Sequence, residues 1–211
     1  MLAVACDAPA PLDLAAWAGM PLACVPLGAP FQPLTAGQRL LVARDGLYLE
    51  AASPALYVRL RLASAPTVWG SIEPAITLVN GRIPRSLMMD LCTLSLEAHP
   101  KEMAALVLAD ADAPGGYRLH RPDGVGHVGA VTYDDTAYAE GSLVVDAHSH
   151  GPYPSVFSAT DDVSDRSRLE PHLSLVFGAC GDRETLSVAA RVCVGDYLIR
   201  LTDDQMGALI A

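Results

Sequence analysis

The sequence predicts an α/β domain over residues 80–211, preceded by a β-rich extension over residues 1–79. Short runs in both parts alternate apolar and polar residues, which is the pattern of half-buried strands. Helical spacing and capping signals are found only after the turn-forming pair Asn80-Gly81, so strands and helices mix beyond this point. With 211 residues, of which 51% are hydrophobic, the chain is long enough for one sizeable core and a small appendage.

The extension is predicted to contain a hairpin and a further strand. Residues 39–51 alternate around Asp45-Gly46, a dipeptide that favours a tight hairpin turn. Residues 55–63 alternate again, with leucine or valine at every second position. Residues 1–33 are rich in Ala, Pro and Leu without a clear period, so no firm structure is predicted for them.

The α/β part is predicted to begin with a helix. Pro84 suits a first helical turn, and a stripe of Leu and Met residues continues at helical spacing until Pro100 interrupts it. A second helix is predicted for residues 159–169, and Asp203-Asp204 can start a final helical turn. The predicted strands are residues 102–108, 117–121, 127–133, 143–150, 172–178, 186–194 and 197–201.

A group of residues in the last third of the chain has the spacing of a metal site. His148 and His150 end a predicted strand, and because residues two apart on a strand share a face, their imidazoles point the same way. The seven residues that follow include two prolines and form a loop, which returns the chain to the histidines. Ser158 then occupies a helix N-cap position, with Asp161 in the first turn. Two imidazoles and a carboxylate leave the fourth position of a tetrahedral zinc ion to water, so the pattern predicts an open, hydrolytic zinc site.

For some of these residues the sequence is also compatible with a different role. Ser158 and Asp161 alone form an ordinary helix-capping pair. Asp162 could replace Asp161 as the ligand on spacing alone. Asp146 shares the strand face of the histidines, where it either orients one of them or is a solvated strand residue.

The remaining histidines and the cysteines carry weaker signals. His120 and His127 lack a partner at metal spacing and are predicted to be polar strand or loop residues. The five cysteines form no C-x-x-C pair, which favours free thiols in a reducing cytoplasm. Cys180 or Cys193 could act as a nucleophile, but buried and inert thiols are the better prediction.

The spacing His-x-His, seven residues, Ser-x-x-Asp resembles the JAMM family of zinc metalloproteases, also called JAB, MPN or Mov34. The resemblance implies the fold of that family for residues 80–211: a mixed curved sheet flanked by helices in a cytidine-deaminase-like arrangement. It also implies Zn²⁺ as the cofactor. The ligands that it implies are His148, His150 and Asp161, and Ser158 would stabilise the oxyanion.

The family also requires an upstream glutamate, which acts as the general base. It normally stands at the start of an apolar strand after the first core helix, and Glu102 fits that place. The resemblance therefore implies that Glu102 takes a proton from water and passes it to the leaving amine. Glu97 and Glu140 are rival candidates, but neither opens an apolar run.

The function that the resemblance implies is hydrolysis of a peptide or isopeptide bond at the C-terminus of a ubiquitin-like protein. Residues 145–150 and 157–162 are most similar to bacterial members encoded in PRTRC gene cassettes. Those cassettes also encode a ubiquitin-like protein and a ThiF-like activating enzyme, which are the partners that the resemblance implies. Departures from the family pattern, such as Gly151 in place of proline, concern the substrate groove rather than the ligands.

Charge and composition argue against other classes of protein. A net charge of −10, from 24 acidic residues against 14 Lys and Arg, would repel a nucleic-acid backbone. The first 20 residues carry no basic leader and no apolar run could span a bilayer, so we expect a cytoplasmic protein with no membrane partner. Two alternatives to a peptidase are a catalytically silent module that binds a ubiquitin-like partner and a small-molecule hydrolase such as a deaminase. The latter usually needs the C-x-x-C ligand pair that this chain lacks.

Overall fold

The computed structural model describes residues 20–133 and 138–211. Contacts within the chain divide it into two compact units, Met1–Thr77 and Leu78–Ala211, a division that lies close to the expected boundary at residues 79–80. The lack of firm structure expected for residues 1–33 falls partly on residues 1–19, which lie outside the described residues. Residues 20–33 contribute one short strand.

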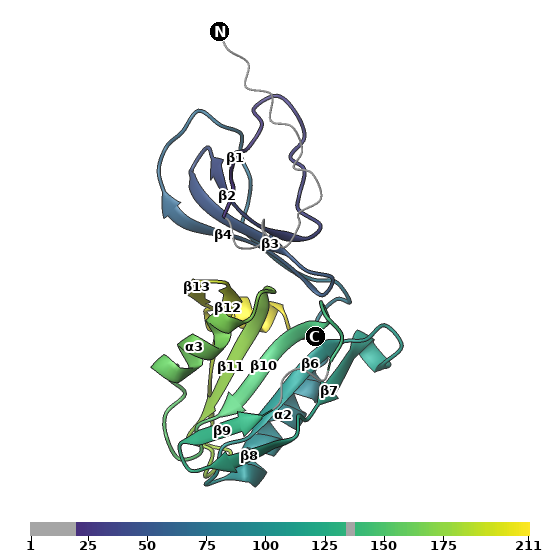
Figure 1. The fold of residues 1–211 in the computed structure, drawn as a ribbon, viewed down its shortest axis with the longest axis vertical. Coiled ribbons are helices and arrows are strands. Elements are labelled where there is room, and N and C mark those ends of the chain that lie inside the picture. The colour runs from purple at the N-terminus through teal and green to yellow at the C-terminus, as the bar shows by residue number, and fades with distance from the viewer. Residues whose placement is uncertain (1–19, 134–137) are drawn as a thin grey trace. The chain divides into compact units, whose positions relative to one another are not determined.

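The first unit is built on a five-stranded sheet in the order β1-β2-β3-β4-β5 (Figure 1). β1 runs parallel to β2, whereas β2, β3 and β4 form an antiparallel meander. The strands are β1 (Leu22–Cys24), β2 (Gly37–Ala43), β3 (Gly46–Ala52), β4 (Leu56–Ser64) and β5 (Ala75–Leu78). The β-rich extension predicted from the alternating pattern is therefore confirmed.

The hairpin between β2 and β3 turns one residue earlier than the Asp45-Gly46 signal predicts. Ala43 pairs with Gly46, so the turn residues are Arg44 and Asp45, and Gly46 opens β3. A Cβ atom on Gly46 would lie 1.9 Å from the carbonyl oxygen of Ala63 in β4. The glycine thus serves the close approach of two strands rather than the turn itself.

The second unit contains a six-stranded sheet in the order β13-β12-β11-β10-β6-β7 (Figure 1). β10 runs parallel to β11, and the other neighbouring pairs are antiparallel. Its strands are β6 (Ala104–Ala109), β7 (Tyr117–His120), β10 (Leu143–Ser149), β11 (His172–Gly178), β12 (Ser187–Val194) and β13 (Tyr197–Arg200). The predicted mixed sheet is confirmed.

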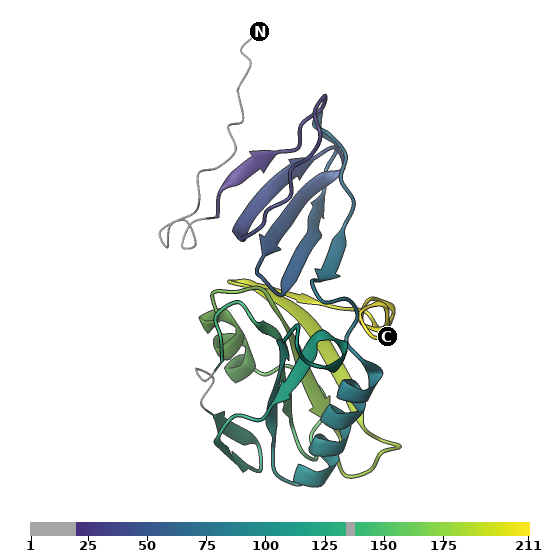
Figure 2. The same ribbon diagram turned by 90° about the vertical axis from the view of Figure 1, so that its right-hand side faces the viewer.

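Helices flank this sheet, as the sequence predicts. The helices of the described residues are α2 (Arg85–Ala98), α3 (Ala159–Ser167), α4 (Asp203–Ala208) and the 3₁₀ turn η1 (Pro114–Gly116). α2 contacts β10 and α3 contacts β12 and β13, and Figure 2 shows strands of the sheet between α2 and α3. None of the helices within residues 20–133 and 138–211 is long and apolar enough to cross a membrane.

Two of the predicted strands need correction. The strand expected over residues 102–108 starts at Ala104, so Glu102 lies in the segment that leads into β6. The single strand expected over residues 127–133 is a hairpin, formed by β8 (Gly124–His127) and β9 (Ala130–Tyr133). Gly129 has a φ of +84°, a conformation that favours glycine, and this turn divides the run.

The register of the sheet brings the candidate residues to one face. Asp146 and His148 point to the same side of β10 because residues two apart share a face. Asp146 pairs with Ser174 in β11, and Ser174 pairs with Arg191 in β12. Paired residues on neighbouring strands share a face, so Arg191 lies on the same side as the histidine. This is also the side on which Arg191 meets α3.

Candidate metal centre

Three predicted ligands converge at the end of β10. The Nε2 atoms of His148 and His150 are 3.2 Å apart. Asp161, from the first turn of α3, places Oδ1 3.1 Å from His148 Nε2 and Oδ2 3.4 Å from His150 Nε2. The three side chains are only 12–13% exposed, so the cluster faces a cavity rather than open solvent.

These separations fit a tetrahedral metal ion. With ligand bonds of about 2.0–2.1 Å, a tetrahedral zinc ion holds its ligand atoms about 3.3 Å apart. The separation of the two imidazole nitrogens, 3.2 Å, agrees with that edge length, and each nitrogen lies 3.1–3.4 Å from one of the two carboxylate oxygens of Asp161. The donor set of two imidazoles and one carboxylate is also one that zinc accepts in sites with an open position.

A helix cap positions the carboxylate of Asp161. The backbone N–H of Ser158 donates to Asp161 Oδ2 at 2.6 Å, and the backbone N–H of Asp161 donates to Ser158 Oγ at 3.2 Å. This is a complete capping box, as expected for a serine followed three residues later by an acid. The cap and the cluster are compatible, because Asp161 Oδ1 still faces His148. Ser158 accepts one hydrogen bond in this arrangement, and its hydroxyl proton is left to donate.

The loop between the histidines and the helix sets the tautomer of His150. Its Nδ1 atom lies 3.3 Å from the carbonyl oxygen of Pro154, so Nδ1 donates, and in the neutral form of His150 Nε2 carries the lone pair that a metal needs. Gly151 starts this loop with a φ of +55°. A Cβ atom there would lie 2.4 Å from the carbonyl oxygen of Pro100, so the glycine allows the loop to approach the segment before Glu102.

Glu102 lies beside the cluster because its neighbours pair with the end of β10. Met103 exchanges two 3.0 Å hydrogen bonds with Ser149, one to its hydroxyl and one from its backbone N–H. The N–H of Glu102 donates to the carbonyl of His127 in β8 at 2.9 Å. Glu102 is 8% exposed, and this burial raises its pKa, although the nearby imidazoles act in the opposite direction. A carboxylate with a raised pKa is the kind of group that acts as a general base near neutral pH.

All five predicted site residues line one cavity of about 670 Å³: Glu102, His148, His150, Ser158 and Asp161. The rival bases Glu97 and Glu140 are both exposed and do not line this cavity. Of the three glutamates that the sequence offers as a base, only Glu102 therefore faces the cluster.

Comparison with known families follows the same division of the chain. A family model described as prokaryotic homologs of the JAB domain matches residues 84–191, just over half of the chain. This chain belongs to the JAB family. A second family model, a domain of unknown function called DUF2016, matches residues 10–79. Among curated proteins, no relative matches the chain at a significant level.

The JAB domain holds Asp161 in a charged environment. Burial alone would raise its pKa, but hydrogen bonds with His148 and His150 outweigh that effect, and the pKa lies well below its usual range. The pKa of His150 is raised, mainly by the same hydrogen bond. A metal must displace the proton that His150 retains, so metal affinity falls as the pH falls.

Arg191 is a supporting residue that sequence reasoning missed. From β12 it donates to Asp165 Oδ2 through Nε at 2.7 Å and to Asp162 Oδ1 through Nη1 at 2.5 Å, both on α3. Its guanidinium also lies 3.8 Å from the ring centroid of Phe157, next to the helix cap. Arg191 therefore fixes the start of α3, which carries Asp161, against the sheet. Only the packing of α3 on β12 brings these residues together, so no sequence pattern could indicate them.

A second group of potential ligands, all of them buried, is formed by Asp165, His172 and Cys193. The JAB domain and its groups of potential ligands are thus compatible with a bound metal ion. In this second group Arg191 already pairs with Asp165, and the thiol of Cys193 donates to the same carboxylate at 3.2 Å. Burial raises the pKa of Cys193, which opposes the thiolate form that a metal needs. We interpret this group as an ionic network that supports α3.

Asp146 has neither of the two roles that its strand position suggests. It is 2% exposed, so it is not a solvated strand residue. Its carboxylate accepts a hydrogen bond from the Tyr133 hydroxyl at 2.9 Å and pairs with the guanidinium of Arg168. Asp146 therefore connects β9 and the end of α3 to β10. Its partners are Tyr133 and Arg168 rather than the neighbouring histidines.

The other singled-out residues lie outside the cluster. His127 is exposed and reaches Glu102 through its backbone carbonyl. His120 ends β7, on a strand that does not neighbour β10. Cys180 is 1% exposed, and burial raises the pKa of its thiol, which is unfavourable for a nucleophile. The predicted thiol Cys6 lies outside the described residues.

The two aspartates at the start of α3 should differ in their effect on the metal. Asp161→Asn keeps an acceptor for the cap but loses the ligand charge, and we expect zinc affinity to fall by at least about a hundredfold, more than for a residue that only orients a ligand. Asp162→Asn removes a partly exposed ion pair to Arg191, worth about 0–1 kcal/mol, and should weaken zinc by at most about fivefold. Competition with a chromogenic chelator measures both, and the reverse ranking would assign the ligand to Asp162.

Proposed function

We propose that this protein is a zinc-dependent peptidase that hydrolyses a peptide or isopeptide bond at the C-terminus of a ubiquitin-like protein. Membership of the JAB family supports a hydrolase. The observation that carries the proposal is the cluster itself: two imidazole nitrogens 3.2 Å apart, each 3.1–3.4 Å from a carboxylate oxygen of Asp161, with Glu102 lining the same cavity.

In the proposed mechanism, His148, His150 and Asp161 would hold the zinc ion. When bound, zinc supplies Lewis-acid polarisation of the substrate carbonyl and a lowered pKa for water. Glu102 accepts the proton of the attacking water and later delivers it to the leaving amine. The free hydroxyl proton of Ser158 donates to the oxyanion that forms at the carbonyl. In this mechanism, different residues bind the metal, transfer the proton and stabilise the oxyanion.

The rim of the cavity suits an extended peptide. Tyr153 and Val156, on the loop after the histidines, line it and are 53% and 59% exposed. Residues 129–131 of the β8–β9 hairpin line it as well, and a Cβ atom on Gly129 would lie 3.8 Å from the ring of Tyr153. The flexible tail of a ubiquitin-like protein would lie along this rim, with backbone hydrogen bonds to a strand edge. A bacterial PRTRC cassette would supply such a protein together with a ThiF-like activating enzyme, and both are proposed partners.

The main alternative is a catalytically silent module that binds the same partner. Such a module has no need for a base, an oxyanion donor and three preorganised ligands in one cavity. The deaminase alternative is less favoured, because the His148–His150–Asp161 cluster contains no cysteine, whereas zinc deaminases use cysteine ligands. Zinc content and turnover on a ubiquitin-like substrate separate the three functions.

Ser158→Ala tests the proposed oxyanion donor. Turnover of a fusion between a ubiquitin-like protein and a reporter should fall by an amount equivalent to about 3 kcal/mol, while zinc is retained. Because Ser158 also caps α3, Thr202→Ala is a matched control: Thr202 forms the same capping box on α4. If both variants lose turnover equally, the loss comes from helix destabilisation and Ser158 is not the donor.

A further inference from the structure

A second cavity lies across Glu102 from the metal cluster. It measures about 370 Å³ and is bounded by the end of α2, the segment leading into β6, and the β8–β9 hairpin. Glu102, Val131 and Tyr133 line both this cavity and the one that contains the ligands. The volume is at the lower end of the roughly 300–1,000 Å³ typical of small-ligand pockets, which suits a few residues of peptide rather than a folded domain.

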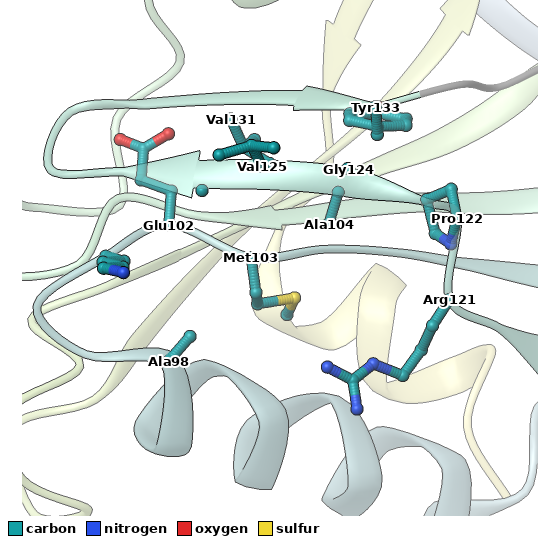
Figure 3. A pocket seen from close by; sticks show the side chains of 12 residues that line it. Ala98, Glu102, Met103, Ala104, Arg121, Pro122, Gly124, Val125, Val131 and Tyr133 are labelled. Atoms are coloured by element: carbon teal, nitrogen blue, oxygen red, sulfur yellow. The ribbon is translucent and has the colours of Figure 1, made fainter.

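This second cavity carries two positive charges, Lys101 and Arg121. Lys101 is the only lysine in a chain whose net charge is −10. Figure 3 shows the guanidinium of Arg121 extending below Met103, whereas the Glu102 carboxylate points the other way. Within residues 20–133 and 138–211, neither cation has a carboxylate at ion-pair distance. Both side chains are exposed, and two cations that line one cavity of an acidic protein without a carboxylate partner among the described residues indicate a place for a negative charge.

The mechanism proposed above decides which part of a substrate would reach these cations. Glu102 must deliver its proton to the leaving amine, so the residue that carries this amine lies next to Glu102. The acyl side of the bond lies in the cavity that contains His148 and His150. The chain beyond the amine then continues past Glu102 into the cavity of Lys101 and Arg121.

We propose that this cavity binds a carboxylate on the leaving side of the scissile bond. A guanidinium and an ammonium form charge-assisted hydrogen bonds with carboxylates, and they would favour substrates that carry one within a few residues of the cut. The carboxylate comes either from an acidic side chain or from the C-terminus of a short extension. The inference rests on the proposed function for its direction, but the binding itself can be tested without catalysis.

The experiment uses the metal-free full-length protein and two pairs of peptides, measured by nuclear magnetic resonance titration at low salt. One pair is acetyl-Gly-Gly-Glu-amide and acetyl-Gly-Gly-Gln-amide, which differ in side-chain charge. The other pair is acetyl-Gly-Gly-Gly with a free or an amidated C-terminus. In at least one pair we expect the acidic peptide to bind at least about tenfold more tightly than the neutral peptide of that pair. A preference in the first pair would assign the carboxylate to an acidic side chain, and a preference in the second pair would assign it to a C-terminus.

Variants assign the preference to the cavity. Lys101→Gln combined with Arg121→Gln should remove it, whereas Arg183→Gln combined with Arg200→Gln, a control that removes the same charge from exposed positions outside both cavities, should retain it. His148→Ala should also retain it, which separates this site from the metal ligands. Equal binding of acidic and neutral peptides, or a preference that survives the Lys101 and Arg121 changes, would overturn the inference. A protein that shows the preference but cleaves nothing would instead contradict the proposed function.

Discussion

The Glu102→Gln variant is expected to keep its zinc and its substrate affinity but to lose at least about a hundredfold in turnover, the usual scale for a general base. Glutamine preserves the size of the side chain and its place beside the cluster, but it cannot accept a proton from water. Its backbone contacts to His127 and, through Met103, to Ser149 remain intact. Zinc content, binding of a ubiquitin-like protein and cleavage of its fusion to a reporter are measured in parallel.

Two matched controls are available for this prediction. Glu97→Gln and Glu140→Gln make the same chemical change at exposed positions outside the cavity, and both should cleave at the wild-type rate. A Glu102→Gln protein that cleaves as fast as wild type would move the base elsewhere. A protein that loses zinc together with turnover would show that Glu102 supports the ligands instead.

Removal of either imidazole should abolish metal binding. We expect about one zinc ion per chain in the wild type and almost none in His148→Ala or His150→Ala, because each change leaves two of three protein ligands. The remaining imidazole and Asp161 would form an ordinary ion pair with no preference for a metal. Dialysis against a weak chelator followed by elemental analysis gives the zinc content.

His127→Ala is the matched control for these variants, because His127 contacts Glu102 only through its backbone carbonyl, which the substitution leaves in place. It should retain zinc. Full zinc occupancy in both His148→Ala and His150→Ala would show that these residues are not ligands. The group of Asp165, His172 and Cys193 would then be the next candidate for the zinc site.

The parts of the structure that local sequence determines are predictable. His148 and His150 lie together because a strand returns every second side chain to one face, and the Ser158–Asp161 cap follows from the first turn of a helix. The strand predicted over residues 172–178 has the same bounds in the structure. Four of its seven residues are Leu, Val or Phe, and a short apolar run of this kind favours a buried strand.

Features that depend on tertiary contacts cannot be predicted in the same way. Arg191 is one polar residue in an apolar strand, and only the packing of α3 reveals its three partners. The burial of Asp146 depends on Tyr133 and Arg168, which are distant in sequence. The sequence predicts one strand in place of the β8–β9 hairpin because Val128-Gly129 is a weaker turn signal than Asp-Gly or Asn-Gly.

The capping box of α3 links the folding of that helix to the affinity of the metal. Asp161 closes the first helical turn through Ser158 and also faces both imidazoles, so the two equilibria share one side chain. A lost N-cap typically costs about 1 kcal/mol of helix stability, which corresponds to roughly a fivefold change in a coupled binding constant. Substitutions that fray this turn weaken the site without touching a ligand, and an ion bound there resists the fraying in return.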